Sequence, residues 1–120
     1  GSNFEIEQDV DYVIHAASPV EPQEYLMDAY SAMQQMVAMT DAVLNLCKRK
    51  EVKSMLYLSS GAVYGAQVNS VARMAEDYCG SINLNDSRSC YAQTKRYCEM
   101  LCNLSGVPVS IARLFSFVGP

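Results

Sequence analysis

The chain has little of what several protein classes require. It has one histidine and no Cys-x-x-Cys pair among its five cysteines, Cys47, Cys79, Cys90, Cys98 and Cys102. An odd number of thiols without paired spacing indicates reduced, mostly buried cysteines of a cytosolic protein. We therefore expect no metal, and a zinc site is the lesser alternative.

Long apolar runs and basic runs are also missing. No stretch approaches the length of a membrane span, and the first residues are acidic, unlike the start of a signal peptide. The formal net charge of −4 disfavours nucleic acid as a partner. We expect a cytoplasmic protein without membrane or nucleic-acid partners, and an anionic small molecule stays open as a ligand.

Glycine is scarce, and its placement excludes one motif. The six glycines are Gly1, Gly61, Gly65, Gly80, Gly106 and Gly119, and none of them form a G-x-x-G-x-x-G turn. Such a turn holds a dinucleotide pyrophosphate at a helix N-terminus. The sequence therefore lacks the phosphate-binding start of a dinucleotide-binding fold.

What is present is an alternation of strand-like and helix-like segments. Residues 11–18, 54–60 and 107–115 have the apolar runs of buried strands, and residues 25–50 and 91–104 repeat apolar residues at helical spacing. Parallel strands joined by right-handed crossovers follow from this order. Half of the chain is hydrophobic, which is enough for the core of one domain.

Two details of this pattern bear on function. Residues 67–89 show little periodicity and are rich in Asn, Asp and Ser, which predicts a long surface loop of the kind that is usually functional. The methionine-bearing face of the first helix, with Met33 and Met36, indicates core packing rather than a cofactor site. Ser105 and Gly106 mark the end of the second helix.

Three polar residues form a candidate site. Ser60 ends the second strand, and the carboxyl ends of parallel strands are where ligands bind. Tyr91 and Lys95 share one face of the second helix. A lysine ammonium beside a phenol favours the phenolate, which can act as a general base toward an alcohol proton. Alone, the pair also fits a surface lysine packed over a helical tyrosine.

Together these stretches resemble the extended short-chain dehydrogenase/reductase family, the NAD-dependent nucleotide-sugar epimerases and dehydratases. The matching stretches are DYVIHAAS, EVKSMLYLSSGAVYG, DSRSCYAQTKRYCEMLC and VSIARLFSFVGP. The resemblance implies an α/β fold, a parallel β-α-β-α-β portion of a Rossmann-type NAD(P)-binding domain that fills residues 1–120 with no second domain. It also implies that the glycine-rich turn and the substrate domain lie outside this chain, which would then be inactive alone.

The resemblance implies a role for each matching position. Tyr91 falls on the catalytic base, Lys95 on its partner and Ser60 on the catalytic hydroxyl. The implied cofactor-binding residues are Ala16, Ala17, Thr40, Leu58, Tyr91 and Lys95. The implied substrate-binding residues are Ser18, Ser60, Gly61, Tyr91 and Ser116.

The activity implied is epimerisation of a nucleotide sugar. By resemblance, Tyr91 takes a proton from the sugar C4 hydroxyl, Ser60 hydrogen-bonds the same oxygen, and NAD, or alternatively NADP, carries the hydride away and returns it to the other face. Gly61 and Ala62 stand where the family's dehydratases have Asp-Glu and its decarboxylases keep a Glu. Dehydratase, decarboxylase or reductase activity, a non-catalytic truncated domain, and a chance Tyr-Lys pair are the alternatives.

Other departures concern the surroundings of the site and the assembly. Met36, Met39 and Ser116 stand where the family usually has asparagine, glycine and asparagine. In the family, the strand at residues 11–17 pairs with a strand that these 120 residues do not contain. An open sheet edge pairs readily with other chains. We expect a homo-oligomer, and we expect the isolated chain to self-associate rather than bind NAD as a stable monomer.

Overall fold

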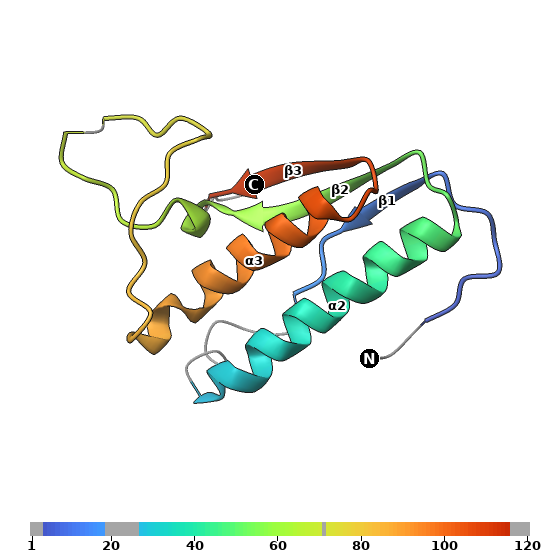
Figure 1. The fold of residues 1–120 in the computed structure, drawn as a ribbon, viewed down its shortest axis with the longest axis horizontal. Coiled ribbons are helices and arrows are strands. Elements are labelled where there is room, and N and C mark those ends of the chain that lie inside the picture. Colours follow the sequence, from blue (N-terminus) through green and yellow to red (C-terminus); the bar gives the residue numbers. More distant parts are fainter. Residues whose placement is uncertain (1–3, 19–26, 71, 116–120) are drawn as a thin grey trace, which may run out of the picture.

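The computed structural model describes residues 4–18, 27–70 and 72–115. Within these ranges, strands and helices alternate as expected (Figure 1). The long elements are β1 (Tyr12–His15), α2 (Ala29–Arg49), β2 (Ser54–Ser60), α3 (Cys90–Leu104) and β3 (Val109–Leu114). Two short 3₁₀ helices, η1 (Gly61–Tyr64) and η2 (Ser87–Ser89), lie between β2 and α3.

The strands form one parallel sheet in the order β1-β2-β3. The register places His15 beside Tyr57, and Ser59 beside Arg113. Both long helices pack on the same face of the sheet (Figure 1). Because side chains alternate along a strand, Met55, Tyr57 and Ser59 point toward the helices and are buried.

The helix ends follow local chemistry. The Asp28 side chain accepts a hydrogen bond from the Ser31 amide at 3.1 Å and caps α2, while the expected start at residue 25 lies outside the described residues. Lys48 and Arg49 lie in its last turn, where cations suit the helix dipole. After α3, Gly106 has φ of 80°, a conformation that favours glycine and ends the helix as expected.

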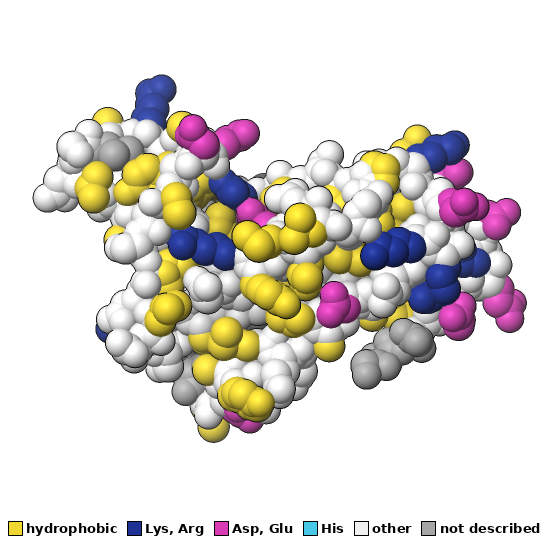
Figure 2. Space-filling model, in the orientation of Figure 1, with side chains coloured by type: hydrophobic (Ala, Val, Ile, Leu, Met, Phe, Trp, Pro, Cys, Tyr) yellow, Lys and Arg dark blue, Asp and Glu magenta, His cyan; other side chains and the backbone are white. Residues whose placement is uncertain are grey.

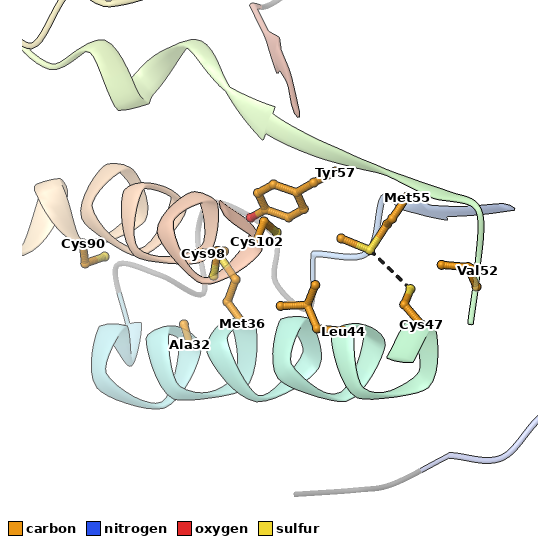
Figure 3. Packing of buried hydrophobic residues seen from close by; sticks show 10 residues of the cluster. All are labelled: Ala32, Met36, Leu44, Cys47, Val52, Met55, Tyr57, Cys90, Cys98 and Cys102. Carbon is orange, nitrogen blue, oxygen red and sulfur yellow. Dashed lines mark hydrogen bonds between the residues drawn. The ribbon is translucent and has the colours of Figure 1, made fainter. Parts of the chain in front are cut away.

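The core lies between the two helices and the inward face of the sheet (Figure 3). Its buried members are Ala32, Met36, Leu44, Cys47, Val52, Met55, Tyr57, Cys90, Cys98 and Cys102. The Cys47 thiol donates to the Met55 sulfur at 3.6 Å. The expected core role of the methionine-bearing face of α2 is confirmed, since Met36 is 2% exposed and Met33 packs against the cluster.

The opposite face of the sheet is open in the described part of the chain. Tyr12 and Ile14 of β1 are each 68% exposed there, and Leu114 of β3 is 41% exposed. The sheet is therefore covered on one face and apolar on both, as expected of parallel strands.

The long connection between η1 and α3 is a surface loop up to Asp86, as expected. Its last residues differ from that expectation, because the Asp86 side chain accepts from the Arg88 amide at 3.0 Å and starts η2. No helix in the described ranges combines the length and apolarity needed to cross a bilayer.

Candidate active site

Ser60 is the last residue of β2 and the N-cap of the short helix η1 that follows. Its side-chain oxygen accepts a hydrogen bond from the Ala62 amide at 3.1 Å and caps η1. A serine hydroxyl that accepts in this way still has its own hydrogen to donate. The capping bond therefore fixes the Ser60 side chain at the strand end without using its donor.

Lys95 reaches from α3 to the end of β2. Its side chain is buried, with 4% of the residue exposed, and its Nζ donates to the Leu58 carbonyl at 3.0 Å. Burial lowers the pKa of Lys95 below its usual value, and Cys98 and Glu99 partly oppose that effect. The Lys95 ammonium is therefore held at Leu58, which lies two residues before Ser60 in β2.

Tyr91 lies one helical turn before Lys95 and is half-buried. The Lys95 Nζ lies 5.8 Å from the centre of the Tyr91 ring. The structure therefore brings the expected tyrosine and lysine together on one face of α3. The packing of α3 against β2 and η1 places this pair at the end of the sheet where Ser60 lies.

The residues predicted to bind the cofactor occupy two kinds of place. Ala16 and Ala17 follow β1 directly and are exposed at the carboxyl end of the sheet. Thr40 is fully buried in α2, and its hydroxyl hydrogen-bonds the His15 Nε2 at 3.0 Å. Leu58 is half-buried and contributes its carbonyl to Lys95. Their contact with a cofactor stays a prediction.

The residues predicted to bind substrate are partly gathered. Ser18 is exposed after β1, at the same end of the parallel sheet as Ser60. Gly61 lies under the Phe115 ring, where a Cβ would stand 2.5 Å from the Phe115 Cε1 atom. Ser116 lies outside the described residues. Their contact with substrate also stays a prediction.

Sequence reasoning gave His15 no role, and the structure places it behind the site. Its ring lies 5.3 Å from the Tyr57 ring, at a tilt of 37°. Burial first, and then the Lys95 charge, lower the pKa of His15 to about 4. His15 is therefore neutral at physiological pH. The sequence carries no direct signal for this placement, because the register that pairs His15 with Tyr57 joins two different strands.

A second missed feature is the ion pair between Glu99 and Arg113. The Arg113 guanidinium forms a fork to both Glu99 oxygens, at 3.0 and 2.9 Å, and donates to the Glu76 carbonyl at 2.6 Å. It also lies 4.8 Å from the centre of the Tyr64 ring. Arg113 thus links β3 to α3, to η1 and to the long loop.

Comparison with known proteins identifies the group to which these features belong. The model of the NAD dependent epimerase/dehydratase family matches residues 3–120. The chain belongs to this family. The expected resemblance and the Rossmann-type α/β fold are therefore confirmed, and the family consists of NAD-dependent enzymes.

Relatives in this epimerase/dehydratase family include decarboxylases. UDP-glucuronic acid decarboxylase 1 of Xenopus tropicalis is 33% identical over 116 residues, which are 93% of this chain and 27% of that protein. UDP-glucuronic acid decarboxylase 1 of Arabidopsis thaliana is 34% identical, over 93% of this chain and 26% of that protein. The chain thus spans about a quarter of these relatives.

Solved structures of similar fold carry nicotinamide cofactors. RMD from Pseudomonas aeruginosa, complexed with NADPH, has a TM-score of 0.74 at 27% identity, over 89% of this chain and 36% of that one. UDP-glucuronic acid 4-epimerase from Bacillus cereus, in complex with NAD, has a TM-score of 0.64 at 26% identity, over 88% of this chain and 32% of that one. Both a decarboxylase and an epimerase are therefore among the similar proteins.

Proposed function

We propose that the whole protein is an NAD-dependent nucleotide-sugar epimerase and that this chain supplies its proton-transfer residues. The observation that carries the proposal is the buried Lys95 ammonium beside the Tyr91 ring, at the strand end that Ser60 closes. We also propose that residues 1–120 are one part of a larger Rossmann-type NAD(P)-binding domain, since the chain spans only about a quarter of the decarboxylase relatives.

The residues present suit a nicotinamide dinucleotide. Ala16 and Ala17 are small and exposed at a strand end, which leaves room for a ligand to approach the backbone. Lys95 uses one of its three N–H donors on the Leu58 carbonyl, so two remain for ribose hydroxyls. We propose Ala16, Ala17, Thr40, Leu58, Tyr91 and Lys95 as the cofactor-binding set, with Thr40 acting from behind through His15.

The proton chemistry rests on this chain's own residues. Bound NAD would accept a hydride from the sugar carbon and return it. Tyr91, beside the Lys95 ammonium, takes the proton of the sugar hydroxyl and later gives it back. Ser60 donates a hydrogen bond to the same oxygen with the hydrogen that its capping bond leaves available. We propose Ser18, Gly61 and Ser116 as further substrate contacts.

The absence of an acid after Ser60 favours epimerisation over elimination. Gly61 and Ala62 supply no carboxylate, and a side chain at Gly61 would collide with the Phe115 ring. The second candidate is decarboxylation of UDP-glucuronic acid, which the decarboxylase relatives favour. Incubating the whole protein with NAD and UDP-glucuronic acid separates the two, because one reaction gives an epimer and the other releases carbon dioxide.

The decisive variant is Tyr91→Phe in the whole protein. We expect turnover to fall by about a hundredfold or more, the usual contribution of a general base, while the variant still binds NAD in calorimetry. Tyr97→Phe is the matched control, because Tyr97 lies on the same helix and is 52% exposed. Turnover that survives Tyr91→Phe would show that Tyr91 is not the base.

We also propose that the protein is a cytoplasmic homo-oligomer. All cysteines are free thiols, and four of them are buried, which suits a reducing compartment. Met100 and Leu104 of α3 are 61% and 78% exposed, and Figure 2 shows hydrophobic side chains gathered over α2 and α3. Such an apolar surface suits contact with a second subunit. Light scattering of the whole protein tests this directly.

A further inference from the structure

Lys95 is a buried cation with few compensating groups. Only 4% of the residue is exposed, and no carboxylate lies within ion-pair distance of it among the described residues. Glu99, one turn along α3, is held by the Arg113 fork instead. A buried charge is costly unless neighbouring groups stabilise it. The single hydrogen bond to the Leu58 carbonyl leaves much of that cost uncompensated.

The Tyr57 ring provides the second compensating contact. The Lys95 Nζ lies 5.0 Å from the centre of this ring, closer than its 5.8 Å to the Tyr91 ring. An ammonium within about 6 Å of a ring centre is attracted by the negative face of the ring, and the attraction grows when both groups are desolvated. Tyr57 is 1% exposed, so water does not screen this contact.

The position of the Tyr57 ring is fixed from several sides. The His15 ring packs on it, and Met36, Cys98 and Cys102 lie around it in the core (Figure 3). A ring held in this way cannot turn away from the ammonium without disturbing the core. Tyr57 therefore presents a fixed surface to Lys95.

The Tyr57 hydroxyl, in contrast, contributes little to this arrangement. It is buried, and no nitrogen or oxygen of the described residues hydrogen-bonds it, although the Cys98 sulfur lies beside it. Burial raises the pKa of Tyr57 far above its usual value, so it never becomes an anion that could pair with Lys95. Whatever Tyr57 does for Lys95, it does through its ring.

We propose that Tyr57 is a positioning residue whose ring face keeps the Lys95 ammonium charged and directed at Tyr91. The inference rests on the proposed function for its catalytic consequence. The other groups facing Lys95 are His15 from β1 and Tyr91, Cys98 and Glu99 from α3. His15 is neutral and the Glu99 charge is paired with Arg113, so neither replaces the ring.

The test compares Tyr57→Phe with Tyr57→Leu in the whole protein. Lys95 is titrated by NMR of ¹³C-methylated lysines, with its signal assigned by its loss in Lys95→Met. Phe keeps the ring, so the pKa of Lys95 is unchanged. Leu removes the ring, so the pKa of Lys95 falls by about one unit, and the alkaline limb of the pH–turnover profile moves to lower pH by the same amount.

A second series keeps the shape of the core. Phenylalanines with increasing fluorination at position 57 fill nearly the same volume while their ring faces become less negative. The pKa of Lys95 should fall stepwise along this series. A constant pKa of Lys95 along the series, or in a folded Tyr57→Leu variant, would overturn the proposal and leave Tyr57 as core packing only. A falling pKa in a protein without epimerase turnover would support the ring contact and reject the proposed function separately.

Discussion

At the scale of single residues, His15 should make the stability of the folded chain depend on pH in the acid range. Its pKa of about 4 in the folded chain lies below the ordinary 6.5, so between these values the unfolded chain binds a proton that the folded chain refuses. Stability therefore rises with pH through this window and is lost as the pH falls. A shift of this size corresponds to about 3 kcal/mol of unfolding free energy.

We predict that the free energy of unfolding of the unsubstituted chain, measured with urea, is a few kcal/mol lower at pH 4 than at pH 7. His15→Gln can still hydrogen-bond Thr40 but does not titrate, so it should lose most of the difference between these two pH values. Asp28 and Asp86 have lowered pKa values, so the stability that they contribute is lost at lower pH than the stability that His15 contributes. The prediction is wrong if His15→Gln keeps the full pH dependence.

The candidate site was only partly predictable at this scale. Tyr91 and Lys95 could be paired because helical spacing is a local property of the sequence. The contact of Lys95 with Tyr57 could not be predicted in that way, because the two residues lie on different elements. Neither could the burial of Thr40 against His15, which depends on how α2 packs beside β1. Contacts of this kind have no sequence period.

At the scale of elements, two arginines hold the long loop after η1. Arg96 of α3 donates to the Val63 carbonyl at 2.7 Å and to the Gly80 carbonyl at 2.7 Å. Arg113 of β3 reaches the Glu76 carbonyl. Helical periodicity predicted the two helices, and its absence predicted the loop. Neither could predict these arginine hydrogen bonds, since they join residues far apart in the chain. The loop is therefore held at defined points despite its irregular backbone.

We predict that Arg96→Lys loosens this loop, because an ammonium cannot reproduce two directed guanidinium bonds. Hydrogen exchange of the Ala66 amide, which donates to Ser81, and of the Gly80 amide, which donates to Tyr64, should accelerate about tenfold to a hundredfold. Arg88→Lys is the control, because its ion pair with Asp86 is local and its side chain is 80% exposed. Equal exchange rates of these two amides in the Arg96→Lys and Arg88→Lys variants would contradict the role assigned to Arg96.

At the scale of the whole molecule, the sheet has one covered face and one open face. Within the described ranges, β1 pairs only with β2, so its other edge is available for pairing. The open face adds exposed Tyr12 and Ile14. Edges and apolar faces of this kind promote association between chains.

We predict that the 120-residue chain by itself sediments as an oligomer and that Ile14→Lys shifts it toward the monomer. Leu84→Lys is the matched control, since Leu84 is 78% exposed but lies on the loop rather than the sheet. Sedimentation velocity with and without NAD measures both effects. A compact 13.3 kDa monomer that binds NAD with an affinity in the micromolar range would refute the prediction.

The sulfur-rich core has a consequence for the chemistry of the folded chain. Cys47, Cys98 and Cys102 are each at most 1% exposed, while Cys79 is exposed on the loop. An oxidant or alkylating agent can therefore reach the innermost thiols only when α2 and α3 separate from the sheet. Folding therefore shields these thiols from reagents. The rate at which they are modified is set by how often the fold opens rather than by their intrinsic nucleophilicity.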